Sequence, residues 1–292
     1  MRATLTRPEP DRRFETQKRD EDMEQIHVTQ WGEAGPVVVL VHGSAQGSRV
    51  GGDKHFAAQR ALAARGWRLR VPDRPGHGRS PSPGRPDDAE ADGAWVADLL
   101  GDGAHLVGHS FGGCVALAAA ARRPDAVLSL TLIEPGMHRL AAHDTVVRRF
   151  LVRLLFILLF SISPVTRARR FAKLVGIPPE IGDSKDRAEL AAMGRGIARL
   201  RVPSAQTLRR ELNIVKQAHI PLLVVTGGWN PAFETVGKTV ATAGGGQHRT
   251  VASPHHFPNL VGAHFNELLE QFMKAAVTPG RQSSDVAMSA LN

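Results

Sequence analysis

The chain of 292 residues is 42% hydrophobic and 22% charged, which is the length and composition of one globular domain with a modest insertion. Its single cysteine, Cys114, excludes an intramolecular disulfide framework, and no stretch reaches the roughly 20 apolar residues that a membrane-spanning helix needs. The beginning of the chain lacks the short apolar core of a secretory signal, so we expect a cytoplasmic protein.

The formal charge of +9 is concentrated between Arg139 and Lys173, where the only acidic residue is Asp144. A basic balance alone indicates non-specific attraction to anions and does not identify a partner. The sequence contains no zinc-ligand spacing, no RNA-reading aromatic motif and no helix-turn-helix signature. We therefore expect no nucleic-acid partner.

Residues 1–22 are dominated by charges, which predicts a disordered arm, and Met23 is an alternative start. An alternation from Ile26 to Gln30 predicts a strand, and the β-branched run 36–41 predicts a second, buried one. Helical and strand patterns then take turns along the chain. We predict helices over 55–65, 89–100, 111–122 and 263–275, and strands over 67–71, 104–108, 127–133, 220–226 and 247–252. This order predicts an α/β fold with a doubly wound, mostly parallel sheet, built from residues 23–136 and 220–277.

The interruption in this alternation, residues 137–219, has helical patterns and no strand pattern, which predicts a helical cap. Its run from Phe150 to Phe160 is the most apolar in the chain, and we predict a lid helix whose apolar face is buried over the cleft at Ser110. The run contains Arg153 and is too short to span a bilayer, although its basic flank also fits a helix lying on a membrane surface. Residues 278–292 are predicted to be a disordered tail.

The segment Gly108-His-Ser-Phe-Gly112 matches the G-x-S-x-G nucleophile elbow, and it falls between a predicted strand and a predicted helix, as that motif requires. The flanking glycines let the strand and the helix pass close together without side chains. Ser110 would then stand at a helix N-terminus, where free N–H groups favour developing negative charge. The pattern indicates a nucleophilic serine.

Three further segments support a resemblance to the α/β-hydrolases, which extends from about Gln25 to Met273. His42-Gly-Ser44 resembles the family's oxyanion loop, and Asp73-Arg-Pro-Gly-His-Gly-Arg-Ser80 resembles its D-x-P-G-x-G-x-S turn. His255-His-Phe-Pro258 resembles the segment that carries the catalytic base, with His255 in place of a glycine. The resemblance implies that His256 is the base, that the backbone N–H groups of Phe111 and Ser44 form the oxyanion hole, and that no cofactor is needed.

The acid of the triad departs from the usual pattern. The resemblance places it after the strand 220–226, but Asn230 stands there, and an amide lacks the charge that stabilises an imidazolium. Glu134, at the end of the preceding strand, occupies the position that a minority of the family uses. We predict that Glu134 is the acid, with Glu234 as the competing choice. The alternative for Glu134 is a purely structural role, in which its carboxylate only holds the loop of the cap in place.

Other polar residues receive less specific roles. We expect no metal site, and we place the histidines at 77, 105, 109 and 143 at the surface or in turns. Cys114 is predicted to be a buried, inert thiol, and Asp73 a structural turn residue. The substrate pocket is predicted to include His42, Phe156, Phe160 and Trp229.

These residues together predict a serine hydrolase that cleaves an ester or lactone bond of an apolar small molecule through an acyl-enzyme. A serine nucleophile argues against epoxide hydrolases and dehalogenases, whose chemistry needs a carboxylate. Carbon–carbon bond hydrolases and thioesterases use a similar triad, and they stay open as alternatives. A hydrolase-like binding protein without activity is the alternative from a different class. The oligomeric state is not predicted.

Overall fold

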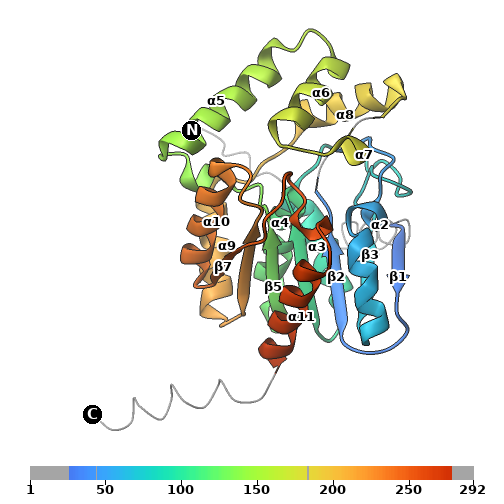
Figure 1. Cartoon of the computed structure of the whole chain (residues 1–292), viewed down its shortest axis with the longest axis vertical. Helices are drawn as coiled ribbons and strands as arrows, with labels where there is room; N and C mark the ends of the chain where they lie inside the picture. The colour runs from blue at the N-terminus through green and yellow to red at the C-terminus, as the bar shows by residue number, and fades with distance from the viewer. Residues whose placement is uncertain (1–25, 44, 183, 278–292) are drawn as a thin grey trace, which may run out of the picture.

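The computed structural model describes residues 26–43, 45–182 and 184–277, and Figure 1 shows a central sheet flanked by helices. The sheet has seven strands in the order β1-β3-β2-β4-β5-β6-β7, with β1 antiparallel to β3 and all other pairs parallel. The strands are β1 (Val28–Trp31), β2 (Val37–Val41), β3 (Arg68–Pro72), β4 (Ala104–His109), β5 (Val127–Ile133), β6 (Leu222–Thr226) and β7 (Gln247–Thr250). The predicted doubly wound, mostly parallel α/β sheet is confirmed.

The helices follow the predicted alternation and cover both faces of the sheet. Those of the sheet domain are α2 (Gly52–His55), α3 (Ala89–Leu99), α4 (Phe111–Arg122), α10 (Pro231–Gly244) and α11 (Ala263–Val277). Between β5 and β6 come α5 (Thr145–Phe160), α6 (Pro164–Leu174), α7 (Pro179–Gly182), α8 (Arg187–Arg199) and α9 (Ala205–Gln217). Short 3₁₀ helices are η1 (Ala57–Arg65), η2 (Pro124–Ala126), η3 (His138–Ala141) and η4 (Pro258–Leu260).

Alternate side chains of the buried strands form two separate cores, because successive residues of a strand point to opposite faces. On one face, Val39 and Leu106 pack with residues of α3, α4, α9 and α10. On the other face, Leu40 and Val107 pack with residues of η1 and α11. Both faces are therefore covered, which explains the unbroken apolar runs in the central strands.

The segment 55–65, predicted as one helix, falls on two short helices of different type in the structure. Residues 52–55 form a single turn of α-helix, and residues 57–65 form a 3₁₀ helix that ends where Gly66 takes a φ of +88°. Apolar spacing over so few residues does not separate a period of 3.0 from one of 3.6, which is why the sequence pattern missed the difference.

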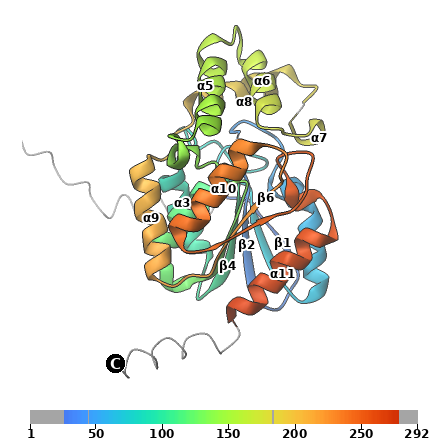
Figure 2. The same cartoon turned by 60° about the vertical axis from the view of Figure 1, so that its left-hand side comes forward.

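The helices α5, α6, α7 and α8 lie together above one end of the sheet, as Figures 1 and 2 both show. The α9 helix lies apart from them and packs on α4 and α10, beside the sheet. In the described part of the chain, no helix is long and apolar enough to cross a membrane. The predicted arm 1–22 and tail 278–292 lie outside the described residues.

Candidate active site

Ser110 occupies a sharp turn between β4 and α4, with φ +56° and ψ −121°. A non-glycine residue rarely adopts a positive φ, so this turn is a strained one that the surrounding structure enforces. The flanking glycines are needed for space. A Cβ on Gly108 would lie 2.5 Å from the carbonyl oxygen of Gly112, and a Cβ on Gly112 would lie 2.3 Å from that of Val41. The elbow therefore has the close strand-to-helix packing that its sequence predicts.

The first residue of α4 is Phe111, whose N–H has no acceptor within the helix because it belongs to the first turn. Gly43 lies against the serine from the other side, since a Cβ there would be 3.0 Å from the Cβ of Ser110. The predicted second oxyanion residue, Ser44, lies outside the described residues. Its neighbour Gly43 nevertheless brings the predicted oxyanion loop to the nucleophile.

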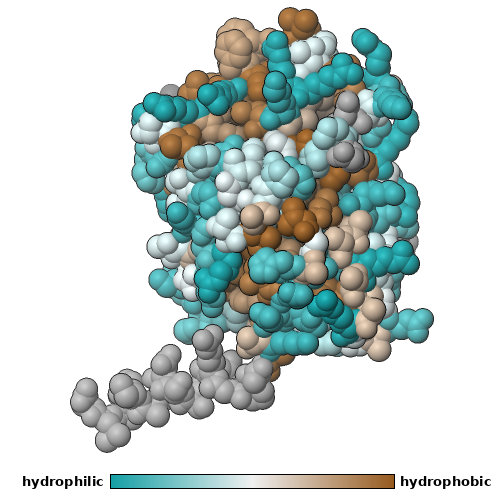
Figure 3. Space-filling model, in the orientation of Figure 1, coloured by the Kyte–Doolittle hydropathy of each residue, from teal (hydrophilic) through white to brown (hydrophobic). Residues whose placement is uncertain are grey.

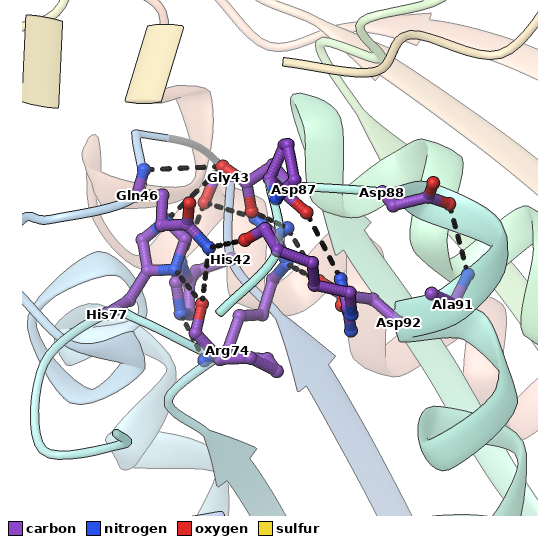
Figure 4. Close-up of polar contacts among 12 residues, drawn as sticks. His42, Gly43, Gln46, Arg74, His77, Asp87, Asp88, Ala91 and Asp92 are labelled. Carbon is purple, nitrogen blue, oxygen red and sulfur yellow. Dashed lines mark hydrogen bonds and ion pairs between the residues drawn. The ribbon is translucent and has the colours of Figure 1, made fainter. Parts of the chain in front are cut away.

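A fully buried arginine supports this loop from below, as Figure 4 shows. The Arg74 guanidinium donates to the carbonyl oxygen of Gly43 at 3.0 Å and lies 4.9 Å from the ring centre of Phe111. It also forms ion pairs with Asp87 and Asp92. These carboxylates raise the pKa of Arg74 against the opposing effect of burial. Arg74 thus joins the predicted oxyanion loop, through Gly43, and the elbow, through Phe111, to the two buried aspartates.

The sequence pattern placed Arg74 in a structural turn but gave it no such role. Its partners lie 13 and 18 residues further along the chain, where no spacing rule points to them. The neighbouring Asp73 accepts the N–H of Gly52 at 2.7 Å and that of Arg79 at 3.0 Å, so its carboxylate is engaged in holding the turn.

His256 lies in the loop between β7 and η4, and its backbone is held on both sides. Its N–H donates to the carbonyl oxygen of Gly176 in the cap at 2.9 Å, and its carbonyl oxygen lies 2.8 Å from Nε2 of His109. The ring nitrogen Nδ1 lies 3.1 Å from Oε2 of Glu134, while Nε2 is buried without a hydrogen-bond partner among the described residues. With its proton on Nδ1, the ring has a free base at Nε2.

Glu134 immediately follows β5 and is completely buried. Its Oε1 accepts the N–H of Gly227 at 2.6 Å, and its Oε2 accepts Nε1–H of Trp229 at 3.1 Å in addition to the contact with His256. The backbone at Glu134 has a φ of +45°, a second strained position at this end of the sheet. Three N–H donors thus converge on the carboxylate.

Burial shifts the pKa values of both partners in opposite directions, because it disfavours the charged form of each. Burial, with a smaller contribution from the neighbouring His255, lowers the pKa of His256 to about 3. Burial also raises the pKa of Glu134 to about 8, against the N–H groups of Gly227 and Trp229, which lower it. The imidazole is therefore neutral at physiological pH, as a general base must be.

The other two side chains considered for the acid position, Asn230 and Glu234, are engaged elsewhere. The Asn230 side chain caps α10 by accepting the N–H of Ala232 at 2.9 Å. Glu234 accepts the N–H of Gly228 at 2.9 Å and the hydroxyl of Thr250 at 3.2 Å. Only Glu134, of the three side chains weighed from the sequence, has a hydrogen bond to His256 within the described residues.

A cavity of about 780 Å³ lies between α5, α6 and the start of α10. Trp229 and Phe156, two of the residues predicted for the substrate pocket, are in its lining. Phe160 is not, and its side chain is exposed. His42 is not part of this lining either, because it is fully buried, with Nδ1 bound to the Gly43 carbonyl and Nε2 accepting the N–H of Arg74. Trp229 connects the cavity to Glu134, a link that the sequence pattern did not reveal.

The lid prediction for residues 150–160 is largely wrong. In α5 only Val147 and Phe150 are buried, and much of the apolar run beyond Phe150 faces outward. Phe150 stacks on His138 with 4.4 Å between ring centres, and it contacts Phe233, which lies 4.7 Å from His256. The base of α5 therefore reaches the candidate site, while its far half is largely exposed apart from Leu158, which packs against the apolar cluster of the cap.

The remaining polar candidates show mixed outcomes. Burial raises the pKa of Cys114 to about 12, which fits an inert thiol. The described residues contain no group of side chains able to hold a metal ion. The surface or turn placement predicted for His105 and His109 is wrong, since both are buried on β4. A fully buried strand accepts a histidine when its ring is bonded, as His105 is to Ser129 at 2.7 Å.

Comparisons with known proteins find relatives of this chain among hydrolases. A family model described as the alpha/beta hydrolase fold matches residues 36–156. Lipase LipV of Mycobacterium tuberculosis is 39% identical over 117 residues, which cover 38% of this chain and 42% of that protein. A 2-hydroxy-6-oxononadienedioate/2-hydroxy-6-oxononatrienedioate hydrolase of Burkholderia vietnamiensis is 38% identical over 117 residues, covering 38% of this chain and 40% of that protein. Each match spans less than half of the relative.

A solved structure resembles nearly the whole chain. A hydrolase from Oleispira antarctica superimposes with a TM-score of 0.65, covering 88% of this chain and 97% of the other. Its sequence identity is 15%, so the likeness concerns the fold alone.

Proposed function

This chain belongs to the α/β-hydrolase superfamily, and from that premise we propose that it is a serine hydrolase cleaving an ester-type bond of an apolar substrate. The observation that carries the proposal is the 3.1 Å contact between Nδ1 of His256 and Oε2 of Glu134, at the same end of the sheet as the Ser110 elbow. A serine, an imidazole with a free Nε2 and a buried carboxylate are the parts of an acyl-transfer site.

In the proposed reaction, Nε2 of His256 takes the proton of the Ser110 hydroxyl as its oxygen attacks the substrate carbonyl carbon. The N–H of Phe111, and that of Ser44 by resemblance, hold the oxyanion. Glu134 stabilises the imidazolium, which then gives its proton to the leaving alcohol. Water releases the acyl group in a second round of the same steps and restores the serine.

The cavity that Trp229 lines supports an apolar substrate class. Its lining is mainly apolar, including Phe150, Phe156, Leu174 and Trp229, which fits an alkyl or ring system. The name of the Burkholderia relative favours carbon–carbon bond hydrolysis as the second candidate. That reaction would use the same serine and histidine on a carbonyl flanked by a carbon leaving group, so the two candidates share the site and differ in substrate.

A fluorophosphonate probe tests the serine mechanism directly, because it labels only an activated serine. We expect labelling of the wild type and none of Ser110→Ala or His256→Ala, with Ser161→Ala on the cap labelled normally. A panel of chromogenic esters, lactones, thioesters and vinylogous diketones then separates the candidates. A wild type that is not labelled and turns over none of these substrates would instead support a binding protein.

A further inference from the structure

The outer end of the cap carries a concentrated apolar surface. We call Val152, Leu155, Phe156, Leu159, Phe160 and Ile162 the apolar tip, and their side chains are between 54% and 91% exposed. Figure 3 shows hydrophobic residues at the top of the molecule, in the region of the turn from α5 to α6, beside hydrophilic side chains. Among the described residues, the other large exposed apolar ones, Val146, Val261 and Val277, are only 37% to 47% exposed. Large apolar patches on a folded protein mark a surface that is covered by something else.

The charged side chains of the two helices that carry the tip are all positive. Residues 145–174, which form α5, the turn and α6, contain no acidic residue. The exposed cations of these helices have no hydrogen bond or ion pair to their side chains within the described part of the chain: Arg148, Arg149, Arg153, Arg169, Arg170 and Lys173. Unpaired cations beside an apolar surface are complementary to a partner that is apolar and anionic at once.

Positive charge and most of the exposed apolar side chains occupy different parts of α5. The last cation of α5 is Arg153, and the apolar tip continues from there to the end of the helix at Phe160. Seven residues of helix rise about 10 Å, which matches the roughly 5–10 Å to which interfacial helices bury their apolar side chains below lipid headgroups. The base of α5 is fixed to the core through Val147 and Phe150. The tip therefore projects from a firmly held base.

We propose that the apolar tip docks on an anionic lipid surface, inserting Phe160 and Ile162 below the headgroups while the cations of α5 and α6 lie at the level of the lipid phosphates. The cavity between α5, α6 and α10 shares Val152 and Phe156 with the tip, and Arg149, Arg153, Arg170 and Lys173 also line it. Docking would bring this cavity next to the lipid. The proposal concerns binding and does not depend on the reaction at Ser110.

Vesicle co-sedimentation of the full chain tests the proposal, with phosphatidylcholine vesicles that contain or lack phosphatidylglycerol. We expect binding to the anionic vesicles and a fall of about a hundredfold in partitioning for Phe160→Ser/Ile162→Ser, because two large apolar side chains no longer insert. Neither residue lines the cavity, so fluorophosphonate labelling and thermal unfolding should stay unchanged. Val261→Ser, an exposed apolar change elsewhere, should bind like the wild type.

The net charge of +9 could attract anionic vesicles to any part of the surface, so two further double variants, each removing two cations, are compared. Arg149→Gln/Arg153→Gln removes two cations beside the tip, and Arg60→Gln/Arg122→Gln removes two exposed cations on the sheet domain. We expect the first pair to weaken anionic-vesicle binding at least tenfold more than the second. Equal losses would overturn the proposal in favour of non-specific attraction. Unchanged vesicle binding of Phe160→Ser/Ile162→Ser would overturn it too. So would a wild type that does not bind vesicles and forms a dimer in sedimentation equilibrium, if Phe160→Ser/Ile162→Ser dissociates that dimer.

Discussion

Replacing Glu134 with glutamine changes one oxygen to an NH₂ group and leaves the shape of the side chain intact. The carboxylate accepts N–H donors at both oxygens, from Gly227 at Oε1 and from Trp229 and His256 at Oε2. An amide placed either way therefore points its NH₂ at a donor. If the NH₂ faces Gly227, two donors meet across 2.6 Å. If it faces His256, it donates to Nδ1 and drives the imidazole proton to Nε2, where no proton from Ser110 can then be accepted.

The expected loss follows from that second arrangement. The wrong tautomer and the missing negative charge lower turnover by about 10⁴-fold in a serine-protease triad with the equivalent change, which is roughly 5.5 kcal/mol of barrier. The fold should survive, since a donor facing a donor costs about 1–3 kcal/mol of unfolding free energy. Glu134→Gln should therefore be a folded protein with a loss of about three to four orders of magnitude in kcat.

The assay is steady-state hydrolysis of a chromogenic ester at pH 8, together with thermal unfolding of the same preparations. The matched control is Glu234→Gln, because that carboxylate accepts the Gly228 N–H and the Thr250 hydroxyl and does not contact His256. We expect the control to keep turnover within about threefold of the wild type and to lose no more than about 1 kcal/mol. A loss in Glu234→Gln larger than that in Glu134→Gln would refute the assignment of the acid.

Three further predictions concern the same site. Since burial raises the pKa of Glu134 to about 8 and lowers that of His256 to about 3, kcat/KM should increase with pH, with a midpoint near 8, and Glu134→Gln should lose this rising limb. Trp229→Phe removes an N–H group that lowers the pKa of Glu134, so the limb should move to higher pH and turnover at pH 7 should fall about tenfold, measured by the same pH series. Arg74→Met withdraws the cation between two buried aspartates and should cost about 3–5 kcal/mol of unfolding free energy in a denaturant titration, whereas Arg79→Gln, at a half-exposed ion pair, should cost less than about 1 kcal/mol.

The sheet domain was predictable because its signals are local. Unbroken β-branched runs such as Val37–Val41 occur where both faces of a strand are covered, and glycines with steric demands stand where the chain must turn sharply. The 3₁₀ form of residues 57–65 was not predictable, because its hydrogen bonds and those of an α-helix suit the same short apolar spacing. Nor was the position of α9, whose amphipathic pattern specifies a buried face but not the helices it meets.

The candidate site was predictable where a motif fixes both residue type and backbone, as at Ser110. The contact of Glu134 with His256 followed from strand order, since both residues come after strands whose carboxyl ends share one sheet edge. The supporting residues were not. Arg74 reaches carboxylates on a separate helix and loop, and Trp229 turns its indole N–H towards Glu134 while its ring lines the cavity. Such contacts depend on side-chain directions that no spacing in the sequence encodes.

The two ends of α5 show why the most apolar segment of a chain need not be its most buried one. At the base, Phe150 stacks on His138 and contacts Phe233, which in turn lies against His256, so apolar contact there holds the cap to the candidate triad. At the tip, Phe156 and Phe160 contact each other, with 4.8 Å between their ring centres, and both remain more than half exposed. Hydropathy measures the preference of a residue to leave water, whereas burial depends on what the fold places next to it. The apolar side chains at the tip of α5 extend past the rest of the protein, so they fit a partner with an apolar interior. The cations on the same helix fit a partner with an anionic surface, and an anionic lipid layer has both properties.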